Sequence, residues 1–213
     1  MLDKLQRKLG RYAIRNLMTI ITIGMAAVYV LDTFFSVFFG GALSNLLYFN
    51  PYMILHGQIW RLVTFIFVPM RGSLLTMALS LYFYWMIGSA LEQQWGTFRF
   101  NAFYLCGMLC TIIGGFITGY ADASWLNMSM FLAFALMWPD FEVLLFFILP
   151  VKMKWLALLD AVLLVTSALR GGFSGIILLV MSLLNLALFF GKDAIDKAKY
   201  AYRRYKWKQN WKK

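Results

Sequence analysis

Residues 87–100 read IGSALEQQWGTFRF, and they join two apolar, uncharged segments at residues 74–90 and 100–118. Each segment approaches the length of about 20 residues that a helix needs to cross the hydrocarbon core of a bilayer. The junction carries Glu92 and Arg99 between glycine-marked ends, which is typical of a tight helical hairpin at a membrane surface. Because a carboxylate is costly in lipid, we expect Glu92 to lie at the boundary and to bond to backbone or to Arg99.

The composition is that of an integral membrane protein. The chain has 213 residues, of which 62% are hydrophobic, and its mean hydropathy is +0.71. Soluble domains have only about 45–50% apolar residues. The length allows one compact membrane domain and no separate soluble domain. Cys106 and Cys110 lie four residues apart in an apolar run that supplies no further metal ligands, so we expect them to be small packing residues.

The hydropathy pattern predicts an all-α membrane fold with six transmembrane helices. The predicted spans cover residues 17–39, 73–90, 98–119, 125–138 and 155–169, and a last segment that ends at residue 190. Residues 140–154 should form an interfacial or buried segment, because their apolar core is too short to cross the membrane. Residues 40–71 should lie in the membrane interface as short helices, with Trp60 in the headgroup layer and Arg61 bonding to loop carbonyls.

Basic residues divide the chain into a basic N-terminus at 1–16, a membrane domain at 17–190 and a basic aromatic tail at 191–213. In the six-span scheme every Lys and Arg except Arg61, Arg71 and Arg170 falls on the side of the two termini. The positive-inside rule therefore places both termini in the cytoplasm. We expect the tail to bind anionic lipids; contact with nucleic acid, which the same residues could make, is the alternative. The lipid-binding candidates are Lys199, Arg203, Arg204, Lys206, Trp207, Lys208 and Trp211.

The order of these features resembles the rhomboid superfamily. That family has a six-helix core, a Trp-Arg pair in a first external loop that lies in the membrane, and a Gly-x-x-x-Glu-x-x-x-Gly motif that ends the second span. The pair here is Trp60-Arg61, and the motif consists of Gly88, Glu92 and Gly96, followed by Arg99. We assign these residues to the architecture of the fold.

The resemblance also implies where the catalytic residues of a rhomboid protease would stand. The serine position matches Ser129, but its setting is Asn-Met-Ser-Met where the family has Gly-x-Ser-Gly. Leu169 stands near the position expected for the histidine, and the only histidine of the chain, His56, belongs to the external loop. A serine needs a base within hydrogen-bond reach to become a nucleophile. We therefore expect Ser129 to bond to the carbonyl one turn back and not to act in catalysis.

A kept scaffold that lacks the catalytic pair resembles the inactive rhomboid-like proteins, the derlins in particular. Derlins share the Asn-Pro element and Gln-x-Trp-Arg, which here are Asn50-Pro51 and residues 58–61. The resemblance implies a non-catalytic protein that binds transmembrane segments of other membrane proteins, in quality control or handling, and that thins the bilayer locally. The client-binding residues would be the polar side chains Asn127, Ser129, Asp160 and Ser167.

Two other functions stay open from the sequence. One is an intramembrane serine protease that uses Ser129 with a non-standard base, and the other is a small transporter subunit, which Asp32 and Asp160 keep possible. No cofactor and no metal are expected. The client, the oligomeric state and the membrane are not determined by the sequence, although the lack of a visible retention signal favours a bacterial plasma membrane over the endoplasmic reticulum.

Overall fold

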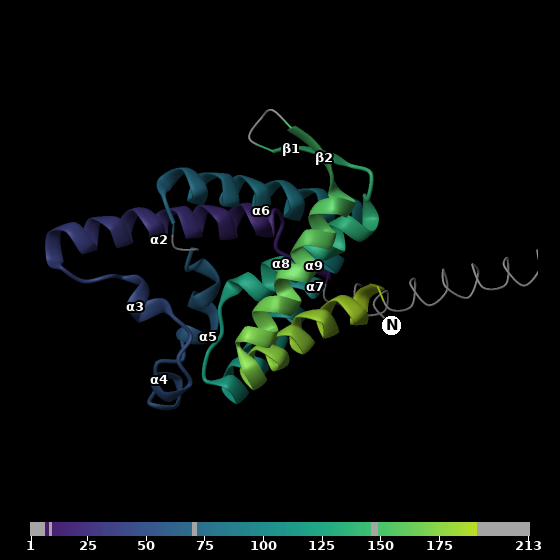
Figure 1. Cartoon of the computed structure of the whole chain (residues 1–213). Coiled ribbons are helices and arrows are strands. Elements are labelled where there is room, and N and C mark those ends of the chain that lie inside the picture. The colour runs from purple at the N-terminus through teal and green to yellow at the C-terminus, as the bar shows by residue number, and fades with distance from the viewer. Residues whose placement is uncertain (1–6, 9, 70–71, 146–148, 191–213) are drawn as a thin grey trace, which may run out of the picture.

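The computed structural model describes residues 7–8, 10–69, 72–145 and 149–190, and it is built mainly of helices (Figure 1). Four helices among these residues are long and apolar enough to cross a membrane. The protein is therefore a helical, multi-pass membrane protein, while the exact number of six crossings stays a prediction. The long helices are α2 (Leu17–Phe39), α6 (Leu74–Trp95), α7 (Thr97–Thr118) and a last helix (Gly172–Phe190), and the shorter or less apolar ones are α8 (Ala123–Met137) and α9 (Met153–Arg170).

The helices form two groups, and α8 belongs to one of them and contacts the other. Helices α2 and α6 run side by side in opposite directions, and they cross a steeper group formed by α7, α8 and α9 (Figure 1). Helix α8 packs against α6, α7 and α9, so it lies at the centre of the bundle. The last helix runs along α7, where Phe189 meets Phe103 with ring centroids 5.3 Å apart. The core between these helices consists of aromatic and aliphatic side chains such as Met18, Ile87, Leu91, Phe100, Phe103, Leu126 and Met130.

The connection between α2 and α6 is a chain of short helical turns, as its mixed sequence indicates. It contains α3 (Ser44–Leu47), α4 (Pro51–Leu55), α5 (Arg61–Thr64) and the 3-10 turn η2 (Phe65–Phe67). Asn50 caps α4, because its side chain accepts a hydrogen bond from the amide of Met53, and Pro51 occupies the first turn. Asparagine before proline is a favourable way to begin a helix, which gives the Asn-Pro pair a local structural role.

Arg61 holds this connection together. Its side chain is buried, with only 5% of its surface exposed. Nη1 donates to the carbonyls of Asn45 and Tyr48 at 3.0 and 2.8 Å, and Nε donates to Oε1 of Gln58 at 2.6 Å. The neighbouring Trp60 donates from Nε1 to the carbonyl of Leu46 at 3.2 Å. The planar guanidinium has several donors in a fixed fork, so one side chain fixes carbonyls that have no partner within a helix.

Glu92 joins α6 to the beginning of α2. Its Oε1 atom accepts a hydrogen bond of 2.9 Å from the backbone amide of Asn16, which stands at the N-cap of α2. Asn16 has a positive φ of 54° and makes no side-chain cap of its own. Glu92 therefore supplies the missing acceptor from another helix, and its negative charge lies near the positive end of the α2 dipole. We expected a backbone partner for Glu92, but the amide belongs to the start of α2 and not to the turn after Glu92.

The two glycines of the motif have different roles. A Cβ atom at Gly88 would overlap the side chain of Met18, so the missing side chain lets α2 approach α6 closely. Gly96 has φ +82° and no atom near the position of a Cβ, so it serves the sharp turn between α6 and α7. Arg99 lies exposed in the first turn of α7. The motif thus combines a helix contact, a helix cap and a turn within nine residues.

The prediction of an all-α fold is wrong at one place. Strands β1 (Glu142–Leu145) and β2 (Leu149–Lys152) pair in antiparallel fashion between α8 and α9, with Glu142 opposite Lys152. The segment is too short for a span, and its β-branched and aliphatic run can pair with itself across the turn. At the base of the hairpin Lys154 donates to Asp140 at 3.0 Å, and this hydrogen bond lowers the pKa of the Asp140 carboxyl.

We predict that Glu92→Ala lowers the free energy of unfolding by about 1–3 kcal/mol, because the amide of Asn16 loses its acceptor while Met18 still packs beside it. Glu92→Gln keeps an oxygen acceptor and should cost less. Gln93→Ala is the matched control, because Gln93 is exposed in the same turn. Thermal unfolding in detergent measures the difference, and equal stability of Glu92→Ala and the control would refute the capping role.

We predict that Arg61→Lys loosens residues 44–61, because a lysine ammonium cannot reproduce the fork that holds the carbonyls of Asn45 and Tyr48 together with Gln58. Limited proteolysis of the purified protein should cleave this connection about tenfold faster than in the unmodified chain, which corresponds to the loss of one or two hydrogen bonds. Arg170→Lys, at an exposed helix end, should leave the rate unchanged. Cleavage at the unmodified rate in Arg61→Lys would contradict the assignment.

Candidate functional site

Ser129 lies in the middle of the bundle, with 1% of its surface exposed. Its hydroxyl donates to the carbonyl of Leu126 at 2.7 Å, close to one turn back along α8, as the sequence leads us to expect. The Oγ atom also accepts a hydrogen bond from Nδ2 of Asn185 at 3.3 Å. The proton of the hydroxyl is therefore directed at a backbone carbonyl, and the group that faces its oxygen is a neutral amide, which cannot accept that proton as a base.

Asn185 is the site residue that the sequence reasoning missed. It lies in the last helix and is completely buried. Gly107 of α7 makes room for it, because a Cβ atom at Gly107 would come within 2.6 Å of Nδ2 of Asn185. One turn away, Ser182 donates from its hydroxyl to the carbonyl of Trp125 at 2.8 Å. Ser182 and Asn185, two polar residues at helical spacing in a mostly apolar last span, were the available signal, and they mark the face that meets α8.

The positions that could have supplied a base lie elsewhere. Leu169, which we placed near the expected histidine, is 66% exposed near the end of α9, whereas the residue that meets Ser129 is Asn185. His56 follows α4, where its Nδ1 lies 2.7 Å from the carbonyl of Tyr52 and its ring lies 4.1 Å from the Tyr52 ring. Both contacts are thus local to the connection between α2 and α6. In the described residues no side-chain base is hydrogen-bonded to Ser129.

The other polar residue of α8, Asn127, belongs to a different surface. Asn127 and Ser129 are two residues apart, so they point about 200° apart around the helix. The Asn127 side chain is hydrogen-bonded to the hydroxyl of Tyr84 on α6, and Tyr84 lies within electrostatic range of Asp160 on α9. The predicted client-binding set is thus divided. Asn127 lies on the side of α8 that faces α6 and α9, where Asp160 of α9 also lies. Ser129 faces the last helix.

Two further acidic and polar candidates have local surroundings. Ser167 is exposed on α9, and its backbone carbonyl accepts from the amide of Gly171 at 2.9 Å. Asp32 accepts from the amide and the hydroxyl of Ser44 at 2.7 and 3.1 Å, so it ties α2 to the first turn of α3. The predicted lipid-binding residues of the tail, from Lys199 to Trp211, lie outside the described residues.

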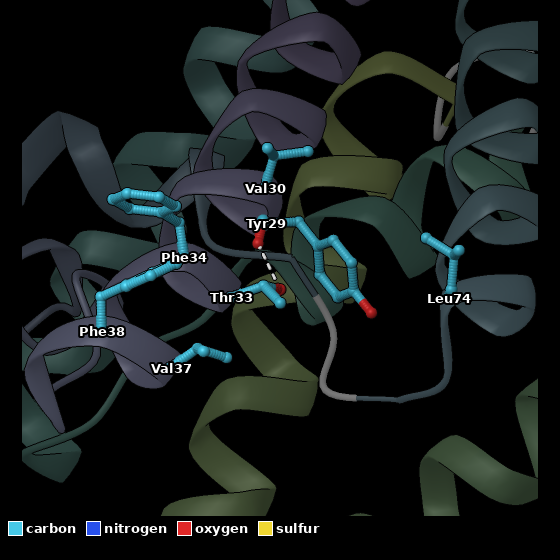
Figure 2. A pocket seen from close by; sticks show the side chains of 7 residues that line it. All are labelled: Tyr29, Val30, Thr33, Phe34, Val37, Phe38 and Leu74. Atoms are coloured by element: carbon cyan, nitrogen blue, oxygen red, sulfur yellow. Dashed lines mark hydrogen bonds between the residues drawn. The ribbon is translucent and has the colours of Figure 1, made fainter.

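An apolar hollow of about 410 Å³ lies where the outer half of α2 faces the first residue of α6. Figure 2 shows Tyr29 and Leu74 on its two sides, with the rings of Phe34 and Phe38 further along α2. The hydroxyl of Thr33 donates to the carbonyl of Tyr29 at 2.9 Å, so this polar group is already bonded within α2. Such a surface suits hydrocarbon, and it offers no set of side chains for chemistry.

We predict that Gly107→Ala lowers the free energy of unfolding by about 1–3 kcal/mol, because the new methyl group would overlap Leu126 and push Asn185 away from Ser129. Gly41→Ala is the matched control, since a Cβ atom there meets nothing within 4 Å. Thermal unfolding in detergent compares the two variants. Equal stability would show that the last helix does not pack against α7 at this glycine.

The comparison with protein families agrees with this geometry. A model of the Rhomboid domain matches residues 56–177, which is more than half of the chain. The match covers the connection with Arg61, the Glu92 motif, the serine on α8 and the start of the last helix. A search of the curated proteins finds no match. From the family model and the helical membrane fold together, the chain belongs to the rhomboid superfamily.

Proposed function

We propose that this rhomboid protein is non-catalytic and that it binds transmembrane segments of other membrane proteins. The rhomboid family includes both active proteases and inactive members, so membership alone leaves the activity open. The observation that carries the proposal is the state of Ser129. Its hydrogen is directed at the carbonyl of Leu126, and the group that approaches its oxygen is the amide of Asn185. A serine in this arrangement has no partner to remove its proton.

The binding part of the proposal rests on the surface between α6 and α9. Helix α9 packs chiefly on α8 and on the hairpin strand β2, and α6 packs chiefly on α2, α7 and α8. Tyr84 on α6 and Asp160 on α9 are each only partly buried, so both side chains lie at the edge of the bundle. A client helix that enters from the bilayer could hydrogen-bond there, and such bonds favour helix association in lipid.

Short helices support local thinning of the bilayer as part of the same function. Helix α8 has 15 residues, which at 1.5 Å per residue span about 22 Å. The hydrocarbon core of a typical bilayer is about 30 Å thick. Helix α9, which has exposed apolar residues such as Leu158 and Leu159, has 18 residues and spans about 27 Å. Lipids beside this helix would adapt by thinning, and this would lower the cost of moving a polar client segment through them.

The cellular setting follows from the charges of the sequence. Both termini would be cytoplasmic, and the basic aromatic tail would contact anionic lipids of a bacterial plasma membrane. The role would then be derlin-like handling or quality control of membrane proteins. Partners would be client transmembrane helices and lipids and not a specific nucleic acid.

We predict that a fluorophosphonate probe does not label Ser129 in native membranes, because the hydroxyl has no base to activate it. Labelling is read by mass spectrometry of the peptide that contains Ser129. An active rhomboid protease in the same membranes is the positive control, and Ser129→Ala is the matched variant. Labelling that is present in the unmodified chain and absent from Ser129→Ala would overturn the non-catalytic proposal in favour of a serine protease.

The binding proposal is tested with a photoreactive residue at Leu163, which is 51% exposed and lies one turn from Asp160 on α9. Leu158 is the matched control, because it is 57% exposed but lies about 200° around the helix from Asp160. Crosslinks to other membrane proteins should form from position 163 and be several-fold weaker from position 158. Equal crosslinking from both positions would contradict a client-binding surface on the Asp160 side of α9.

A further inference from the structure

Five buried side-chain oxygens of the described residues make no hydrogen bond, and three of them belong to residues that lie around the side of α8 facing α6 and α9. In the described part of the chain, Oδ1 of Asn127, the hydroxyl oxygen of Tyr104 and Oδ2 of Asp160 are buried and make no hydrogen bond. Asn127 and Tyr104 have only 3% and 1% of their surface exposed. Buried polar atoms in native proteins nearly always have a partner, so three unpaired oxygens require an explanation.

These groups come from four helices and gather around one side chain. Tyr84 on α6 is hydrogen-bonded to Asn127 on α8 and lies within electrostatic range of Tyr104 on α7 and of Asp160 on α9. Asp160 is the eighth of the 18 residues of α9, so it lies near the middle of that helix. Asn127 and Tyr104 are buried, while Tyr84 and Asp160 are partly exposed. The cluster therefore has a closed floor and an edge that opens beside α9.

Two of the three unpaired oxygens, Oδ1 of Asn127 and Oδ2 of Asp160, are hydrogen-bond acceptors. Amide and carboxylate oxygens accept hydrogen bonds, and the carboxylate also carries the only formal charge that these four residues can gain without deprotonating a phenol. The sequence brings no Lys or Arg to residues 100–138 or to the interior of α6, so no cation of these segments neutralises it. An unpaired acceptor in lipid is costly. In the described residues, Oδ1 of Asn127 and Oδ2 of Asp160 thus remain without a donor.

We propose that the cluster of Tyr84, Tyr104, Asn127 and Asp160 recognises clients whose transmembrane helix carries a Lys or Arg near its middle. This inference rests on the proposed function, and it names the class of client that the surface would select. The ammonium or guanidinium would donate to the carboxylate of Asp160 and to Oδ1 of Asn127. A basic residue is itself expensive in a bilayer, so both partners lose an unpaired polar group when the client binds.

The chain has a second buried polar group on α8 for comparison. Ser129 points to the opposite side, where its hydroxyl is bonded to Leu126 and Asn185. That face is closed by the last helix, which Gly107 admits to close contact. The two faces of α8 thus differ in what they leave unpaired: beside Ser129 the remaining acceptor is the neutral amide oxygen of Asn185, whereas the other face also has a carboxylate oxygen of Asp160 without a partner.

The test uses the full chain in vesicles with the photoreactive residue at Leu163. The clients are three single-span Leu/Ala helices that differ only in a central Lys, Glu or Leu. We expect the Lys client to crosslink about fivefold more than the Leu client, and the Glu client no more than the Leu client, as one intramembrane hydrogen-bonded pair would give. Asp160→Asn should reduce the preference for Lys to near one, while Val162→Ala, an exposed change about 200° around the same helix, should keep it.

The outcomes separate the two proposals. If the three clients crosslink equally in the unmodified chain, or if Asp160→Asn keeps the preference for Lys, the client class is refuted while binding beside α9 stands. If no client crosslinks from position 163, or if every client crosslinks as strongly from position 158 as from position 163, the binding function itself fails. Thermal unfolding of Asp160→Asn accompanies the test. A variant that no longer folds is replaced by Asn127→Leu, which removes the second acceptor and should also lower the preference.

Discussion

The position of helix α2 depends on the carboxylate of Glu92, which belongs to helix α6. Glu92 accepts a hydrogen bond from the backbone amide of Asn16, and so the end of α6 fixes the start of α2. The carboxylate is buried beside the start of α2, so this bond helps to determine where α2 enters the bundle. Gly88, one turn earlier, brings the two helices into contact with Met18. The position of α2 relative to α6 in turn sets where the connection held by Arg61 can lie.

The same constraint explains how the polar groups of α8 are distributed. Because α8 packs on several neighbouring helices, its polar side chains must find hydrogen-bond partners within the protein. Ser129 finds its partners in its own backbone and in Asn185. Asn127 finds Tyr84 for one of its atoms and nothing for the other. Ser129 and Asn127 therefore differ in whether their hydrogen bonds are made, and their angular separation of about 200° around the helix explains this difference.

Much of the architecture could be predicted because its causes are local in the sequence. The apolar runs gave the long helices to within a few residues, and Arg61 and Glu92 could be assigned to the scaffold because buried charges need partners. The hairpin at Glu142–Lys152 could not, since pairing of two short strands depends on register across a turn and an apolar run shows no helix or strand period. Asn185 was missed for another reason: its partner is 56 residues away, and although Ser182 and Asn185 share one helix face, their spacing alone does not indicate which helix that face meets.

In the proposed function, the lack of a base beside Ser129 and the binding surface on the other side of α8 need not be independent. A serine whose bonds are completed by Leu126 and Asn185 stabilises the contact between α8 and the last helix, so that face can be rigid. A rigid central helix then holds Asn127 in place on its other side, where the acceptors remain open. Preorganised acceptors bind a donor at lower entropic cost than mobile ones. The closed face around Ser129 would in this way contribute to binding at the open one without touching the client.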